Sequence, residues 1–92
     1  MDENKIIITV SGTDKTGIVA AVSTLLAKHS VNIEDIKQTL MQGHFVMFML
    51  CDITNANINF KDLKNTLIEE GNKLELEIWV QKKGIFEKLN TI

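Results

Sequence analysis

The first half of the chain changes its apolar spacing several times, and each change marks an expected element. Residues 6–10 alternate between two faces, as the side chains of a strand do. From Gly17 the apolar positions recur at helical spacing, which predicts an amphipathic helix. Residues 32–41 then predict a second strand, with a break in the alternation between Ile33 and Ile36 that a β-bulge would explain.

The second half opens with a hairpin signal at Gln42-Gly43, because a two-residue turn of this type places glycine at a position of positive φ. The elements that follow are an apolar strand over residues 45–51, a helix over residues 60–68 that Gly71 would cap, a half-buried strand over residues 74–80, and a short helical turn over residues 85–89. The main order is therefore strand, helix, strand, strand, helix, strand.

Right-handed crossovers fold this order into an α+β, ferredoxin-like βαββαβ sandwich, a four-stranded antiparallel sheet with two helices on one face. The strands over residues 6–10 and 45–51 become central, in keeping with their apolar character. The chain has 92 residues and is expected to form a single domain over residues 1–92. Its own core is marginal, since a chain of this size buries only about 60–65% of its unfolded surface.

The helices of such a sandwich cover only one face of the sheet. The strand over residues 45–51 carries apolar side chains on both faces: Phe45, Met47, Met49 and Cys51 on one, and Val46, Phe48 and Leu50 on the other. One of these rows must face away from the helices, where Ile7 and Trp79 join it. Monomers rarely expose such a patch, so we expect a partner to cover it, most simply a second copy related by two-fold symmetry.

Composition narrows the class of protein. The net charge is −2 and the chain contains no arginine, so nothing indicates binding to nucleic acid. No apolar run approaches the ~20 residues of a membrane span, and the acidic start does not resemble a signal peptide. A single cysteine, Cys51, excludes an internal disulfide and fits a reducing compartment. These features predict a cytoplasmic protein with neither nucleic-acid nor membrane partners.

The loop over residues 11–17 combines polar side chains with a setting between a strand and a helix. Its two glycines are spaced as in a phosphate-binding P-loop, but Ile18 follows where that motif needs lysine. The three glycines of a dinucleotide fingerprint are also missing. Two interpretations stay open. Backbone N–H groups at the helix start could dock a small anionic or polar ligand, or the loop is a plain connection in which Asp14 or Thr16 caps the helix.

The remaining candidates for chemistry favour packing or surface roles. His29 and His44 have no second ligand at the spacing of a metal site, and His44 and Cys51 point to opposite faces of one strand. Acylphosphatase chemistry, which this architecture supports, relies on an arginine-bearing loop that the chain lacks. RNA binding on such a sheet needs stacking aromatic residues, and the first strand is aliphatic. We therefore expect no metal, no cofactor and no catalytic residue.

Two motifs resemble those of a known family. The loop Ser11-Gly12-Thr13-Asp14-Lys15-Thr16-Gly17-Ile18-Val19-Ala20, followed by Val31-Asn32-Ile33-Glu34-Asp35-Ile36 and Gln38-Thr39, looks like an ACT domain. More narrowly, the chain is similar to small stand-alone ACT proteins of bacteria and archaea. Those are related to the amino-terminal domain of formyltetrahydrofolate deformylase and to the glycine-cleavage repressor. The tail from Val80-Gln81 to Ile85-Phe86 fits the same subgroup, so the resemblance covers nearly the whole chain.

The resemblance implies a non-enzymatic regulatory module that binds an amino acid or a related small metabolite, usually at an interface between two copies. Carried over to this sequence, the ligand contacts are Thr13, Asp14, Lys15, Thr16, Gly17 and Ile18, with Asn32 and Ile33 opposite. Amide groups near Gly17 would receive a carboxylate, and Asp14 would receive an ammonium group. Thr16 departs from the family, since many ACT domains have proline there.

The expected mechanism is differential affinity. A ligand that bridges the loop of one copy and the Asn32 region of another would favour one arrangement of a homodimer. The state of the homodimer would then pass to a regulated protein partner. A dimerisation or partner-binding module with no small-molecule ligand shares all of these fold features, so it stays the alternative.

Overall fold

The computed structural model describes residues 2–89 and follows the main element order that the sequence predicts. Its strands are β1 (Lys5–Thr13), β2 (Asn32–Met41), β3 (His44–Asp52) and β4 (Glu77–Lys82). Its helices are α1 (Ile18–Lys28), α2 (Phe60–Lys73) and α3 (Lys83–Leu89), preceded by the short 3-10 helix η1 (Asp2–Asn4).

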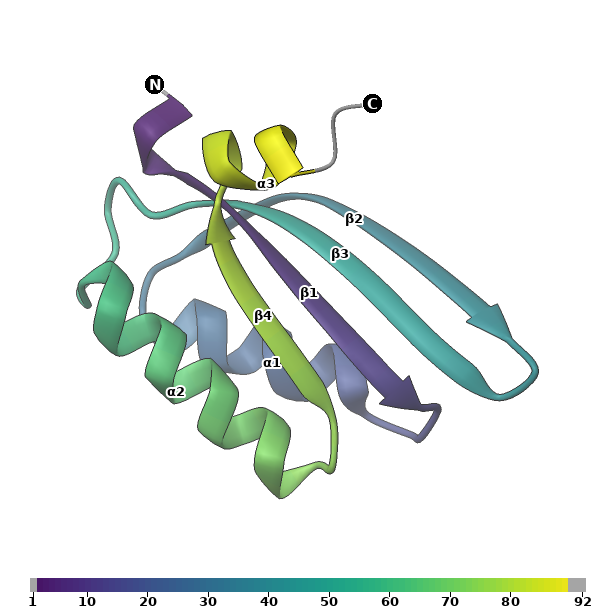
Figure 1. Cartoon of the computed structure of the whole chain (residues 1–92). Coiled ribbons are helices and arrows are strands. Elements are labelled where there is room, and N and C mark those ends of the chain that lie inside the picture. Colours follow the sequence, from purple (N-terminus) through teal and green to yellow (C-terminus); the bar gives the residue numbers. More distant parts are fainter. Residues whose placement is uncertain (1, 90–92) are drawn as a thin grey trace.

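The strands form one four-stranded antiparallel sheet in the order β2-β3-β1-β4, so β1 and β3 are central, as predicted. Both α1 and α2 lie on one face of this sheet, whereas α3 lies on the other (Figure 1). The prediction of a ferredoxin-like βαββαβ sandwich is therefore confirmed, with α3 added at its C-terminal end.

The core lies between the sheet and the two helices that cover it. Alternate residues of the central strands point into this layer and meet the apolar stripes of the helices. The fully buried side chains include Ile6, Ile8 and Val10 of β1, Met47 and Met49 of β3, Val22 and Leu26 of α1, and Leu63 and Leu67 of α2. Each of these contributes about 1.5–3 kcal/mol through removal of apolar surface from water. Two of the four methionines thus fill the core.

The β2–β3 hairpin confirms two local predictions. The register of β2 against β3 shifts between Ile33 and Asp35, where the bulge is expected. Gln42 and Gly43 both have positive φ, 51° and 82°, as in a type I′ turn. The hairpin extends past the helix layer (Figure 1), and Leu40, on the helix side of β2, is 59% exposed.

The boundary between α2 and β4 differs from the prediction. Gly71 does not cap α2 but lies inside it, and the helix continues to Lys73. The following strand begins at Glu77 and not at residue 74, because Glu75 adopts a positive φ of 60° in the turn before it. Gly71 serves packing instead, since a Cβ there would lie only 2.8 Å from Cγ1 of Ile78. The missing side chain lets β4 lie close against α2.

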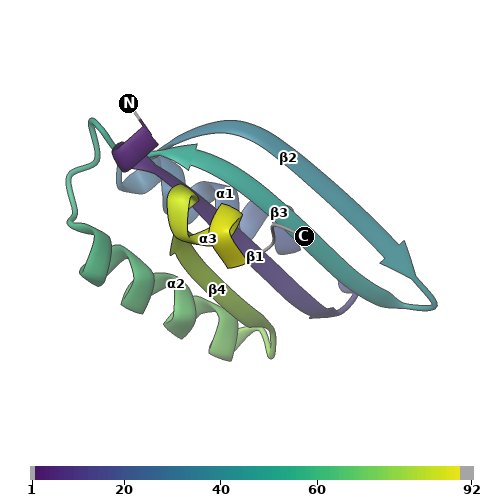
Figure 2. The same cartoon turned by 45° about the horizontal axis from the view of Figure 1, so that its top comes forward.

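The sheet face opposite α1 and α2, called the outer face below, carries the predicted apolar row of Val46, Phe48 and Leu50 with Ile7 and Trp79 beside it, and α3 covers one end of this face. The predicted turn over residues 85–89 belongs to this helix, which begins at Lys83 and lies in front of β1 in Figure 2. Phe86 of α3 meets Phe48 of β3 edge to face, with ring centroids 6.2 Å apart. Within residues 2–89, two aromatic side chains of the outer face stay partly exposed to solvent: Phe48 is 41% and Trp79 51% exposed. A second copy over this face remains a prediction.

Candidate functional site

The loop that the sequence marks as a ligand site joins the end of β1 to the start of α1. Thr13 is the last residue of β1, and Ile18 is the first residue of α1. Between them, Gly17 adopts the left-handed conformation, with φ 89° and ψ 6°, which favours glycine. The amide of Asp14 donates a hydrogen bond of 2.9 Å to the carbonyl of Gly43, so the loop is tied to the tip of the β2–β3 hairpin.

The N-terminus of α1 carries no side-chain cap. Gly17 occupies the N-cap position, and neither Asp14 nor Thr16 accepts a hydrogen bond from the first turn, so capping by these residues is wrong. The N–H of Ala21 donates to the carbonyl of Gly17 at 2.9 Å, whereas the amides of the preceding turn lack a helical acceptor. These amides and the helix dipole favour an anionic group at this position.

The side chains around the loop differ in what they offer a ligand. Thr13, Asp14 and Thr16 are exposed, so their oxygen atoms are accessible. Ile18 is 3% exposed and packs in the core, which leaves only its backbone amide for a ligand. The accessible groups of the loop are therefore backbone donors and a few short oxygen-bearing side chains.

Lys15 is engaged within the fold. Its ammonium group donates a hydrogen bond to the carbonyl of Leu74 and lies 4.0 Å from a carboxylate oxygen of Glu75. Both partners belong to the turn between α2 and β4, so Lys15 anchors the loop to that turn. The structure thus gives Lys15 a structural contact besides the ligand contact that the family resemblance implies.

Asn32 and Ile33, the other half of the predicted site, begin β2. Asn32 is exposed and lines a polar pocket of about 410 Å³, together with Asp52 and Thr54. Ile33 faces the helices and packs against the core, so its side chain contributes mainly to the fold. Asn32 is therefore the accessible member of this pair.

A cluster of charged residues links three strands at the end of the sheet where Asn32 lies, and no sequence motif indicates it. Lys5 of β1 pairs with Asp52 of β3 at 3.2 Å and with Glu34 at the bulge of β2. Hydrogen bonds from the hydroxyl and amide groups of Thr54, and then the pair with Lys5, hold the pKa of Asp52 at about 2. The bond to Glu34 raises the pKa of Lys5. A fixed negative charge therefore stands beside Asn32.

A single chain does not bring the two halves of the predicted site together. At one end of the sheet, Asn32 pairs with Asp52 and Asp52 pairs with Lys5; at the other end, Thr13 pairs with His44. Eight residue steps along β1 separate these ends, which is about 26 Å at 3.3 Å per residue. Within one copy, the two halves are therefore too far apart for one small ligand to touch both.

The histidines and the cysteine make local contacts. His29 shares a hydrogen bond of 3.2 Å with Asn57, and His44 shares one of 2.9 Å with Ser11. Burial raises the pKa of the Cys51 thiol to about 12, so the group is unreactive packing. Within residues 2–89 there is no cluster of three or more groups able to hold a metal, and no helix with the length and apolar character of a membrane span.

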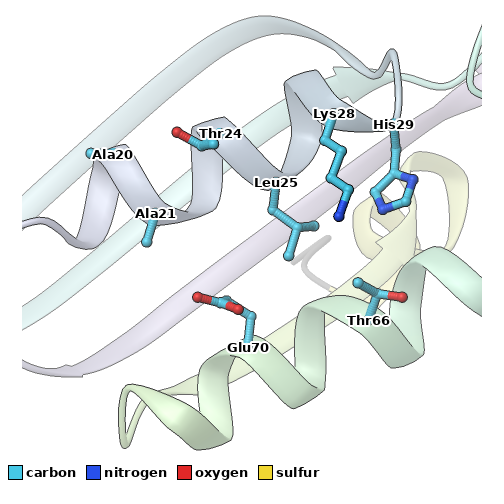
Figure 3. A pocket seen from close by; sticks show the side chains of 8 residues that line it. All are labelled: Ala20, Ala21, Thr24, Leu25, Lys28, His29, Thr66 and Glu70. Carbon is cyan, nitrogen blue, oxygen red and sulfur yellow. The ribbon is translucent and has the colours of Figure 1, made fainter.

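A further groove, of about 440 Å³, lies between α1 and α2 (Figure 3). Lys28 and His29 line it from the end of α1, and Thr66 and Glu70 line it from α2. The groove belongs to the helix layer and shares no residue with the loop or with the start of β2. It is therefore separate from the predicted site.

Most of the sequence matches known proteins. The sequence model of the ACT domain matches residues 4–81. A UPF0237 protein from Clostridium acetobutylicum is 47% identical over 88 residues, which cover 96% of this chain and 99% of that protein. An ACT domain protein from Streptococcus pneumoniae has a TM-score of 0.78 and 40% identity, covering 90% of this chain and 93% of that one.

In two other solved structures, only part of a longer chain matches this protein. A structure provisionally described as a glycine cleavage system transcriptional repressor is 26% identical, with a TM-score of 0.74 over 84% of this chain and 44% of that chain. Formyltetrahydrofolate deformylase from Burkholderia mallei is 16% identical, with a TM-score of 0.76 over 86% of this chain and 28% of that chain. At that identity, the likeness concerns the fold alone. Both relatives that the sequence resemblance named are thus structural neighbours.

Proposed function

Since this chain belongs to the ACT domain family, we propose that it is a non-enzymatic regulatory module that binds an amino acid or a related small metabolite between two copies. The ligand would touch the loop over residues 14–17 of one copy and Asn32 of the other. The observation that carries this proposal is the separation of the two accessible halves by the length of β1. Only a second copy can unite them.

Edge-to-edge pairing of two sheets would supply the required geometry. β2 is an edge strand of 10 residues, and a two-fold axis beside it makes the two β2 strands antiparallel. The start of β2 in one copy then lies beside the end of β2 in the other, which is the end that carries the loop. The same pairing would cover Leu40 of β2, whose side chain is 59% exposed.

The chemistry of the two halves suits a zwitterion. The free amides at the start of α1 would bind a carboxylate, and Asp14 would bind an ammonium group. From the second copy, Asn32 offers both a donor and an acceptor, beside the fixed negative charge of Asp52. A ligand held in this way would stabilise one dimer arrangement. If a regulated protein binds only this arrangement, its binding would depend on the ligand concentration.

A thermal-shift screen of the purified protein against the amino acids tests the ligand. A compound present at about 100 times its Kd adds about 2.7 kcal/mol to the folded state and should raise Tm by about 10 °C in a domain of this size. Asp14→Ala and Asn32→Ala should each abolish the shift. Gly17→Val should do so as well, because a β-branched residue is strained at φ 89°. The control Asn65→Ala, at an exposed position of α2, should keep the shift.

Mixing two inactive variants tests whether one site uses two copies. A heterodimer of Asp14→Ala and Asn32→Ala contains one intact site and one site that carries both changes. After complete subunit exchange, half of the dimers are mixed, so about a quarter of the sites should bind again. No recovery in a mixture whose exchange has been verified would refute the shared site.

The apolar outer face favours a second candidate function, a dimerisation or partner-binding module with no small-molecule ligand. Phe48 and Trp79 are exposed there, and aromatic residues are enriched at protein interfaces. A stable dimer in size-exclusion chromatography with light scattering, combined with no thermal shift for any compound, would support this function. A monodisperse monomer at tens of micromolar would contradict both candidates.

A further inference from the structure

A groove of about 300 Å³ lies between α3 and the outer face of the sheet. Its apolar lining consists of Ile7, Leu50 and Phe48 from the sheet and Phe86 from α3. Because α3 stands above the outer face (Figures 1 and 2), this α3 groove has the sheet as its floor and the helix as a raised wall. None of its residues belongs to the site of the proposed function.

Two residues of opposite charge border the β2 side of the α3 groove, whose lining itself is almost wholly apolar. Asp35 and Lys37 lie two residues apart on β2 and pair in register with Leu50 and Phe48, so both share the outer face. One oxygen of Asp35 accepts a hydrogen bond of 2.9 Å from the amide of Ile36, which orients the carboxylate. Within the part of the chain that the structure describes, the Lys37 ammonium group has neither an ion pair nor a hydrogen bond. Lys37 is thus available to an anionic group.

We propose that the α3 groove is a second small-molecule site, which takes an α-amino acid with a large apolar or aromatic side chain. The side chain packs among the apolar residues of the groove, next to the edge-to-face pair of Phe48 and Phe86. The carboxylate of the ligand meets Lys37, and its ammonium group meets Asp35. A ligand of this class therefore combines an apolar part for the floor with two charged groups for the residues at the rim.

The shape of the α3 groove favours a small molecule over a second copy of the chain as its occupant. Because α3 stands above the outer face, another copy that packs against this face would meet the helix before it meets the sheet beside the helix. The volume also lies at the lower end of the range for small-molecule sites, roughly 300–1,000 Å³. A single amino acid is therefore the better match in shape and in charge.

An NMR titration of the full chain with L-phenylalanine tests the site, because backbone amide shifts report position as well as affinity. We expect saturable shifts at the amides of Asp35, Lys37, Phe48 and Phe86. Two probes isolate the charges: 3-phenylpropionate lacks the ammonium group, and phenethylamine lacks the carboxylate. Each should bind at least about tenfold more weakly than phenylalanine.

Four variants test whether binding depends on residues of the α3 groove or on residues outside it. Phe86→Ala and Lys37→Gln should each weaken binding about tenfold. Ile85→Ala, on the same helix but 54% exposed and outside the groove lining, is the control for the aromatic change. Lys64→Gln, at an exposed position of α2, is the control for the charge change. Since Lys37→Gln alters only an exposed side chain, it remains informative even if Phe86→Ala loosens α3.

Three outcomes would overturn the inference. Shifts confined to residues 13–18 would place phenylalanine at the site of the proposed function and leave the α3 groove empty. Shifts at Phe48 and Phe86 that grow with protein concentration in the absence of phenylalanine would show that a second copy occupies the outer face. Equal affinity for phenylalanine and 3-phenylpropionate would refute the role of Asp35.

Discussion

Gly71→Ala tests whether the close approach of α2 and β4 requires the absence of a side chain. A Cβ at this position would lie 2.8 Å from Cγ1 and 3.0 Å from Cδ1 of Ile78, and 3.0 Å from the carbonyl oxygen of Leu76. Gly71 and Ile78 are both buried, and the Leu76 oxygen belongs to the backbone. The neighbouring atoms therefore have little room to move away from an added methyl group.

Two effects of opposite sign set the expected change in stability. In a helix interior, alanine is more favourable than glycine by about 0.5–1 kcal/mol. Overpacking of a core costs about 1–3 kcal/mol. Because the contacts at Gly71 fall at or below 3.0 Å, we expect overpacking to prevail and the free energy of unfolding to fall by about 1–2 kcal/mol. Gly84→Ala in α3 is the matched control, since a Cβ there meets nothing within 4 Å. Its stability should be unchanged or rise by up to about 1 kcal/mol.

Urea denaturation at a fixed protein concentration measures both changes, with circular dichroism and Trp79 fluorescence as probes. Trp79 is the only tryptophan of the chain and directly follows Ile78 on β4, so it reports on this contact. The double variant Gly71→Ala/Ile78→Ala removes the opposing side-chain atoms. Its loss of stability should be smaller than the sum of the two single losses by about 1 kcal/mol. A Gly71→Ala protein that is as stable as the wild type, or more stable, would refute the packing explanation.

Other parts of the fold should respond measurably to pH, turn chemistry and thiol reagents. The pKa of Asp52 is lowered from 3.8 to about 2, so its stabilising contribution is complete above about pH 4 and is lost as the pH falls through about 2. Asp52→Asn should flatten this part of the Tm-against-pH curve, whereas Glu69→Gln, at an exposed position, should leave its shape unchanged. Gln42→Asn, at φ 51°, should raise the free energy of unfolding in urea by about 0.5 kcal/mol, because asparagine tolerates the left-handed region better; a decrease would argue against the type I′ turn. Cys51 is fully buried with a pKa of about 12, so a thiol reagent should label it only as the protein unfolds, and rapid labelling of the folded protein would contradict its place in the core.

The strands and helices could be predicted because their signals are local. The alternation in residues 6–10 and the helical spacing after Gly17 follow directly from the backbone geometry of each element. The break between Ile33 and Ile36 became a bulge, and Gln42-Gly43 became a type I′ turn, because both signals lie within a few residues of the feature they indicate.

Signals with two possible causes were harder to interpret. A glycine near the end of a helical stripe is typical of a C-terminal cap, but it also allows close packing of a helix on a strand. Gly71 serves the second purpose, which became visible only with Ile78 placed beside it. The pairing of Lys5 with Asp52 likewise depends on strand register, since the two residues lie 47 positions apart in the chain.

The sequence by itself determined the order of the elements, the family, and the residues of the loop and of the start of β2 that the family implicates. Those properties depend on neighbouring residues and on motifs that can be read along the chain. Only the tertiary structure decided that the loop and Asn32 lie at opposite ends of one sheet, that Lys15 turns back toward Leu74, and that α3 leaves a groove on the outer face. These features depend on strand register and on the end of the sheet from which each connection leaves, and neither quantity is encoded in local spacing.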